Sequence, residues 1–160
     1  MKFEHLVELN DLSNPMILVI TREQLWRGLV LRAEAPKLFV SYLDDASITE
    51  RTEVSMTRTL RYGELLITDQ VSLTHLEHVH YHVAAQKDIP QSSLRMTIEE
   101  PQEQALFVRF AYDDGNSAAD DAANELYNEY RRSAYDEADV ETVRLIREMA
   151  EQGRLDNLLS

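Results

Sequence analysis

Apolar and polar residues alternate over roughly residues 46–112, and this period of two limits the fold more than any other property of the sequence. Successive side chains of a β-strand point to opposite faces, so alternation indicates strands with one buried face. Short links separate the alternating segments, and Gly63 permits a turn between the first two. The pattern predicts a meander of antiparallel strands with one apolar face. The clearest segments are Thr52–Tyr62, Glu64–Leu73, Val79–Val83, Leu94–Ile98 and Leu106–Tyr112.

The residues before the meander predict one strand and two short helices. Residues 2–9 alternate and indicate a first strand. Thr21 and Gln24 have the spacing of a capping box, in which each side chain bonds a free backbone N–H of the first helical turn. Pro36 ends that helix, since proline removes a backbone donor and clashes with the preceding turn. Residues 38–40 then form a second, very short helical turn.

The chain ends in a long helical segment. No residue from Ala118 to Glu151 would break a helix, and Gly153 suits the position after a helix end. The apolar stripe drifts around the helix, which predicts a kink or a restart near Asp136–Asp139. The first part of the stripe consists of Ala119, Ala122, Ala123, Leu126, Tyr130 and Ala134. We therefore expect an α+β fold with about seven strands and a long C-terminal helix.

Size and charge exclude several classes of function. A chain of 160 residues predicts a single domain spanning residues 1–160. The absence of cysteine excludes disulfides, thiolate metal sites and a cysteine nucleophile. The formal net charge of −13 argues against binding to nucleic acid or an anionic membrane. The last 48 residues carry 13 acidic and 5 basic side chains, so a basic protein partner for this helix is one alternative to a solvated helix face.

The sequence also gives an expectation about location. The first five residues include Lys2 and Glu4, where a signal peptide would need an apolar stretch. The apolar run from Pro15 to Ile20 is far shorter than the ~20 residues that cross a bilayer. We therefore expect a cytoplasmic protein without membrane insertion.

Four segments carry a resemblance to a known family: Phe3–Glu8, Thr21–Leu29, Met96–Pro101 and Phe107–Phe110. With the order of elements, they resemble the AtaL-like family of the START/Bet v 1-like (SRPBCC) superfamily, named after an acetylaranotin gene cluster. The resemblance implies the helix-grip fold, a curved sheet wrapped around the C-terminal helix over a cavity. Superfamily members bind lipids, hormones or polyketides there, and some catalyse cyclisation or hydrolysis. It implies no particular catalytic residue, cofactor or metal for this chain.

Arg58 and Asp69 are the charged residues that interrupt apolar strand rows. Arg58 lies in the row Val54-Met56-Arg58-Leu60, and Asp69 lies in the row Leu65-Ile67-Asp69-Val71. A turn at Gly63 places them opposite each other, or one pair apart, on the same face. Such a pair could orient a polar group of a ligand, since arginine offers a planar fork of donors. The alternatives are a structural ion pair, or an arginine that covers the core with its stem.

Aromatic residues are spread over the elements that would surround the cavity. Ligand pockets are mainly apolar with a few placed hydroxyls, and tyrosine supplies both. The alternative is that these residues simply form the core. The predicted ligand-binding residues are Trp26, Arg58, Tyr62, Asp69, Tyr81, Tyr112 and Tyr130, with Tyr127 as a further aromatic of the long helix.

Histidines provide two further candidates. His78, His80 and His82 alternate on one strand and could hold a metal with a ligand from a neighbouring strand. Val79 and Tyr81 form the natural core row, however, so we expect the three histidines on the outer face and predict no metal site. His5 lies in the inward row of the first strand, either as a general base or as a core histidine with its hydrogen bonds satisfied; we favour the second.

Three functions remain open. The first is binding of a small hydrophobic molecule between sheet and helix, by a protein that could also form a homodimer. The second is a cyclase or hydrolase for an aromatic or polyketide-like substrate, with His5, Asp69 and Tyr81 as candidate acid–base groups. The third is an acidic protein-interaction module.

Overall fold

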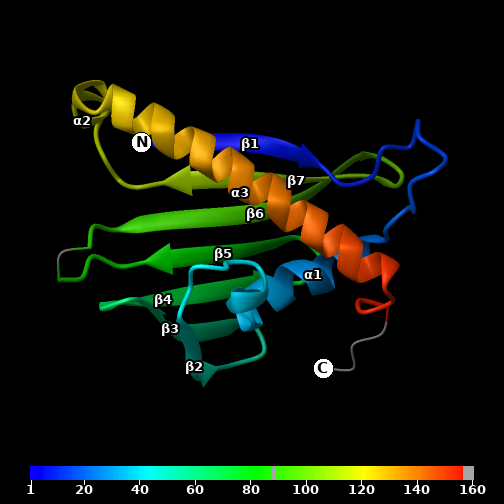
Figure 1. The fold of residues 1–160 in the computed structure, drawn as a ribbon, viewed down its shortest axis with the longest axis horizontal. Coiled ribbons are helices and arrows are strands. Elements are labelled where there is room, and N and C mark those ends of the chain that lie inside the picture. Colours follow the sequence, from blue (N-terminus) through cyan, green and yellow to red (C-terminus); the bar gives the residue numbers. More distant parts are fainter. Residues whose placement is uncertain (88, 157–160) are drawn as a thin grey trace.

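The computed structural model describes residues 1–87 and 89–156 and confirms the helix-grip fold, a curved antiparallel sheet of seven strands with helices on one face (Figure 1). The strand order is β1-β7-β6-β5-β4-β3-β2, so the first strand pairs with the last, and the meander continues from there. The strands are β1 (Lys2–Glu8), β2 (Asp45–Arg51), β3 (Ser55–Tyr62), β4 (Leu65–Thr74), β5 (His78–Val83), β6 (Ser92–Gln102) and β7 (Ala105–Asp113).

Two short helices follow β1, as predicted: α1 (Arg22–Glu34) and the 3₁₀ helix η1 (Pro36–Leu38). The second begins at Pro36 and so lies earlier than the predicted residues 38–40, because proline is favoured in the first turn of a helix. The capping box of α1 is formed, since the Gln24 backbone N–H donates to the Thr21 hydroxyl at 3.1 Å, and the Thr21 backbone N–H donates to the Gln24 side chain at 2.8 Å. In the part of the chain that the structure describes, no helix is both long and apolar enough to cross a membrane.

The C-terminal helical segment restarts earlier than predicted. It consists of α2 (Ala118–Ala123) and α3 (Glu125–Glu151), and the helical backbone breaks at Asn124. α3 runs without interruption through Asp136–Asp139, so the predicted restart at that point is wrong. The apolar stripe drifts there for a different reason: the buried side of the first half of α3 is polar, with Asn128 and Asp139 facing inward.

The core is concentrated where α1 and the second half of α3 pack on the sheet. α3 runs diagonally across the sheet face, and its C-terminal half lies beside α1 (Figure 1). Gly28 of α1 lies at this crossing, because a Cβ atom at its position would come within 2.7 Å of Ile146 Cγ2. Fully buried side chains of the core include Leu25, Leu29, Met96, Leu106, Val108, Phe110 and Ile146. This packing leaves the first half of α3 over a less filled part of the sheet.

Candidate functional site

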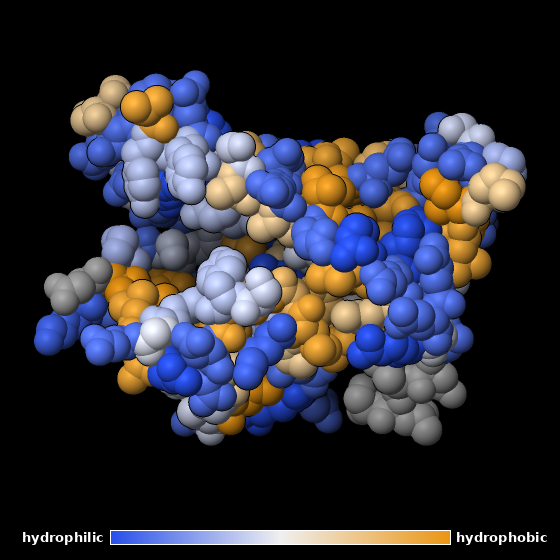
Figure 2. Space-filling view, in the orientation of Figure 1, coloured by the Kyte–Doolittle hydropathy of each residue, from blue (hydrophilic) through white to orange (hydrophobic). Residues whose placement is uncertain are grey.

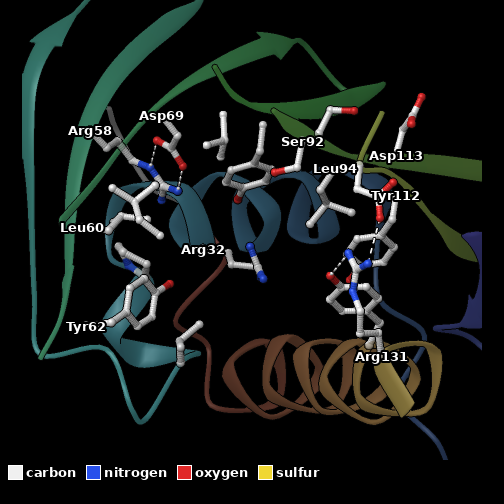
Figure 3. Close-up of a pocket in the computed structure, with 18 of the residues that line it drawn as sticks. Arg32, Arg58, Leu60, Tyr62, Asp69, Ser92, Leu94, Tyr112, Asp113 and Arg131 are labelled. Atoms are coloured by element: carbon white, nitrogen blue, oxygen red, sulfur yellow. Dashed lines mark hydrogen bonds and ion pairs between the residues drawn. The ribbon is translucent and has the colours of Figure 1, made fainter. Parts of the chain in front are cut away.

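A cavity of about 300 Å³ lies between the sheet, the end of α1 with η1, and the first half of α3 (Figure 3). Figure 2 shows the surface hollowed beneath the N-terminal end of α3. Its volume falls at the lower end of the ~300–1,000 Å³ of ordinary small-molecule sites. Its walls include Arg32, Pro36, Val40, Arg58, Leu60, Tyr62, Ile67, Asp69, Tyr81, Val83, Ser92, Leu94, Tyr112, Arg131 and Tyr135. They are mainly apolar and aromatic, with a few charged groups.

Five of the seven predicted binding residues line this cavity, and two lie elsewhere. The five are Arg58, Tyr62, Asp69, Tyr81 and Tyr112. Trp26 is buried and packs edge-on against His75, with 5.8 Å between ring centroids, beside a separate groove between α1 and the β2–β3 turn. Tyr130 is 73% exposed, because the inward side of α3 carries Asn128 and Tyr135 instead. Tyr127 is exposed on the same helix.

Arg58 and Asp69 lie directly opposite each other on β3 and β4, which confirms the predicted register. Arg58 donates from Nε to Asp69 Oδ1 at 2.9 Å and from Nη2 to Oδ2 at 2.5 Å. Its Nη1 donates to the Ala33 carbonyl at 2.9 Å, which ties the end of α1 to the sheet. Both side chains are about 4% exposed. The pair is neutral as a unit, so its charges are already matched within the cavity wall.

Arg32 of α1 also lines the cavity, although it is not among the residues predicted from the sequence. Its guanidinium projects into the middle of the cavity, between the Arg58–Asp69 pair and Tyr112 (Figure 3). The Arg32 guanidinium carbon lies 5.4 Å from the centroid of the Tyr81 ring, and that of Arg58 lies 5.0 Å from the same centroid. Arginine stays protonated in proteins, so Tyr81 contacts two cations through its ring.

A signal for Arg32 is present in the sequence. It follows Leu25 by seven residues and Leu29 by three, so it shares a helix face with two fully buried leucines. Arg58 is predicted as a site residue because it is a charge in an apolar strand row, and Arg32 is likewise a charge on an otherwise apolar helix face. A charge that interrupts an apolar row at helical spacing therefore points to Arg32.

Tyr112, Asp139 and His5 form a hydrogen-bonded chain at one side of the cavity. The Tyr112 hydroxyl donates to the Asp139 carboxylate, with oxygen distances of 2.7 and 2.6 Å. His5 Nε2 lies 2.8 Å from Asp139 Oδ2, and His5 Nδ1 lies 3.0 Å from Asp136 Oδ1. Burial raises the pKa of Asp139 above its ordinary value, and it outweighs the hydrogen bonds from Tyr112 and His5, which lower that pKa.

The environment of His5 matches a histidine whose hydrogen bonds are satisfied. Both ring nitrogens have carboxylate partners, and the ring stacks on Phe3 and Phe110, with centroid distances of 5.2 and 5.5 Å. His5 is not among the residues that line the cavity. Burial also raises the pKa of the Tyr112 phenol, with a further contribution from Asp139, so the hydroxyl keeps its proton as the donor in this chain.

The three alternating histidines of β5 lie on the outer face, since Val79 and Tyr81 between them are buried toward the helices. The His80 and His82 rings stack at 6.5 Å. Burial, followed by the positive charge of Arg95, lowers the pKa of His78 and His80 below the ordinary value of 6.5. Over residues 1–87 and 89–156, no group of three or more His, Cys, Asp or Glu side chains is arranged to hold a metal ion.

A seven-stranded sheet that grips a long helix is the fold of Bet v 1-like (SRPBCC) proteins, and solved structures share this fold. The ZhuI aromatase/cyclase from Streptomyces sp. R1128 is 16% identical with a TM-score of 0.61, over 93% of this chain and 94% of that one. The di-domain aromatase/cyclase StfQ of the steffimycin pathway is 10% identical with a TM-score of 0.66, over 94% of this chain and 51% of that one. The Aha1 dimer from Colwellia psychrerythraea is 11% identical with a TM-score of 0.61, over 92% of this chain and 96% of that one.

The sequence identifies the family within this class. The family model described as acetylaranotin biosynthesis cluster protein L (AtaL) matches residues 7–153. The chain therefore belongs to the AtaL family, as the resemblance of its four segments implied. A sequence search of the curated proteins gives no match.

Proposed function

We propose that this protein binds a small, mostly apolar molecule in the cavity between the sheet and α3. The observation that carries the proposal is the cavity itself, about 300 Å³ in volume and walled by side chains such as Leu60, Ile67, Val83 and Leu94. A cavity of this kind removes apolar ligand surface from water, which is the main source of affinity for such molecules. The Bet v 1-like fold supports the same function.

Binding of a neutral fluorescent probe, N-phenyl-1-naphthylamine, tests this proposal. We expect its fluorescence to rise on binding to the native protein. Leu94→Trp should weaken the affinity at least about tenfold, because the larger side chain fills the cavity. Thr97→Trp is the matched control. Thr97 lies on the same strand as Leu94, three residues later, but its side chain is on the outer face of the sheet. Equal affinities for the two variants, or no binding to the native protein, would refute the proposed function.

The alternative function is a cyclase or hydrolase that acts on an aromatic or polyketide-like substrate in the same cavity. It is supported by two similar structures that are aromatase/cyclases, and by the chain from Tyr112 through Asp139 to His5, which links the cavity wall to two acid–base groups. Asp69 and Tyr81, two of the candidate acid–base groups, both line the cavity. The Asp69 carboxylate is occupied by its pair with Arg58, whereas the Tyr81 hydroxyl is free of such a partner in the described residues. Unchanged turnover of an identified substrate by Asp139→Asn and Tyr81→Phe would exclude these groups from catalysis.

Self-association is the second part of the proposal. One similar structure is a dimer, that of Aha1, and α3 carries Leu126, Tyr127 and Tyr130 with 82%, 62% and 73% exposure. Adjacent exposed apolar side chains of this size are typical of protein contacts. Light scattering at micromolar concentration is expected to give twice the monomer mass for the native protein, and the monomer mass for Leu126→Ser/Tyr130→Ser. A monomeric native protein would contradict the homodimer.

A further inference from the structure

Two buried side-chain polar atoms in residues 1–87 and 89–156 have no hydrogen-bond partner, and both belong to the wall of the cavity. They are Nε of Arg32 and the hydroxyl oxygen of Tyr81. Unsatisfied buried polar groups are rare in folded proteins and costly, so each one needs an explanation. The Arg32 guanidinium lies against the Tyr81 ring, so the two atoms belong to the same part of the wall. Their proximity indicates one cause for both.

The other arginines of the cavity are matched by carboxylates. Arg58 is paired with Asp69, and Arg131 donates to Asp114 at 2.8 Å. Arg32 forms no ion pair with any carboxylate in the described part of the chain. Contact with the Tyr81 ring compensates the charge of Arg32 only in part, since a cation over an aromatic face is a weaker partner than a carboxylate. Among the three arginines of the cavity wall, Arg32 is therefore the one without a carboxylate partner.

We propose that Arg32 and the Tyr81 hydroxyl form a subsite for the carboxylate of a small apolar acid. The inference rests on the proposed function and names the class of ligand. A guanidinium presents two parallel N–H groups to a carboxylate, and the phenol can donate a further hydrogen bond to it. A singly charged acid balances the one unpaired cation, whereas the second charge of a phosphate dianion would have no partner.

The apolar part of the acid has a defined place in this proposal. Leu60, Ile67, Val83 and Leu94 line the same cavity as Arg32 and Tyr81, so an aromatic or aliphatic body attached to the carboxylate would lie against them. Figure 3 places the Arg32 guanidinium in the cavity between Arg58 and Asp69 on one side and Tyr112 on the other. The subsite thus combines one charge contact with an apolar enclosure.

Two probes of nearly the same shape test the subsite, 2-naphthoate and its neutral amide, 2-naphthamide. We expect the native protein to bind the acid at least about tenfold more tightly than the amide, since a hydrogen bond to a charged group is worth about that much. Arg32→Met should remove this preference by weakening the acid and leaving the amide nearly unchanged. Tyr81→Phe, which keeps the ring and deletes only the hydroxyl, should reduce the preference in part.

Lys37→Met is the matched control, because Lys37 is exposed on η1, outside the cavity wall, and its loss changes the net charge equally. Arg32→Lys keeps the charge and should retain part of the preference. Equal affinity of the native protein for acid and amide, or equal effects of Arg32→Met and Lys37→Met, would overturn the subsite. Titrations followed by nuclear magnetic resonance identify each binding site by the residues whose signals shift.

These outcomes separate the two proposals. If the amide and N-phenyl-1-naphthylamine bind in the cavity but the acid has no advantage, the subsite is refuted and the binding function stands. If none of the three probes, N-phenyl-1-naphthylamine, 2-naphthoate and 2-naphthamide, shifts the signals of cavity residues, both proposals are refuted. If the acid binds with its advantage and Leu94→Trp abolishes that binding, both are supported.

Discussion

Asp69 is the residue whose role can be tested most directly. Its carboxylate is 4% exposed and accepts two hydrogen bonds from Arg58. Asp69→Asn would leave the Arg58 cation buried without its counter-charge, which costs about 3–5 kcal/mol when one partner of a buried pair is removed. We expect a loss of this size in the free energy of unfolding, measured by urea denaturation.

The double variant Arg58→Met/Asp69→Leu is the control for this prediction. It removes both charges, and apolar residues of similar volume often replace a buried pair with little loss. We expect it to be more stable than Asp69→Asn alone. A double variant that is less stable than the single one would mean that the two charges do not act as a pair. Glu141→Gln, which breaks an exposed contact with Arg144 on α3, should leave stability unchanged.

Asp139 predicts a pH dependence whose sign follows from its pKa. Burial raises that pKa above 3.8 in the folded protein, so the folded state binds the proton more tightly than the unfolded chain does. The contribution of Asp139 to stability is therefore greatest when it is protonated, and it falls as the pH rises from 3.8 through the raised pKa. The difference in unfolding free energy between native protein and Asp139→Asn should decrease over this window. Urea denaturation from about pH 4 to about pH 7 measures it, and an increasing difference would contradict the prediction.

At the scale of elements, the packing of α1 on α3 depends on a glycine. A Cβ atom at Gly28 would lie 2.7 Å from Ile146 Cγ2 and 2.9 Å from Cγ1. Alanine normally favours a helix interior over glycine by about 1 kcal/mol, whereas overpacking costs about 1–3 kcal/mol. We expect Gly28→Ala to lower the unfolding free energy, because Ile146 is fully buried and its branched Cβ limits its rotamers.

The sign of the change in unfolding free energy shows which contribution is larger in Gly28→Ala, the cost of overpacking against Ile146 or the gain in helix propensity. Thermal and urea unfolding of Gly28→Ala, Ile146→Ala and the double variant provide a double-mutant cycle. The double variant should be more stable than the sum of the single effects predicts, since Ile146→Ala removes the atoms that the new methyl group meets. A Gly28→Ala protein more stable than the native one would show that α1 and α3 do not pack closely there.

The inward faces of the strands can be predicted from the sequence more reliably than the inward faces of the helices, because strand alternation depends only on neighbouring residues. A strand row alternates with a period of exactly two, and the turn at Gly63 fixes the register of its hairpin, so the Arg58–Asp69 pair follows from the sequence. The first half of α3 covers the cavity and not the packed core, and its inward side carries the polar residues Asn128 and Asp139. Hydropathy assigns the inward side to apolar residues, and Tyr130 was placed there for that reason. The position of Arg32 opposite Tyr81 depends on how α1 packs on the sheet, and the local sequence pattern does not determine this packing.

At the scale of the whole molecule, the packed core and the cavity lie under different halves of α3. The core lies under α1 and the second half of α3, and the cavity lies under the first half of α3. The excess negative charge is also uneven, since the last 48 residues hold −8 of the total −13. The inward side of the first half of α3 is polar, and its apolar side chains Leu126, Tyr127 and Tyr130 are exposed, so this half buries little apolar surface. Contacts that stabilise this helix are therefore concentrated toward its C-terminus.

This division predicts a gradient of local stability along α3. In its first half, Asn128 is the one buried residue before Asp139, whereas Thr142, Val143, Ile146, Met149 and Ala150 are buried in the second half. Segments with few buried apolar contacts open locally at free energies below that of global unfolding. Native-state hydrogen exchange should give lower opening free energies for the amides of residues 129–138 than for those of 142–150. The amides of Met96 and Phe110, both fully buried, provide the reference for global unfolding. Equal protection along the whole of α3 would contradict the prediction, whereas the expected gradient would let the first half of the helix move aside and admit a ligand while the core stays folded.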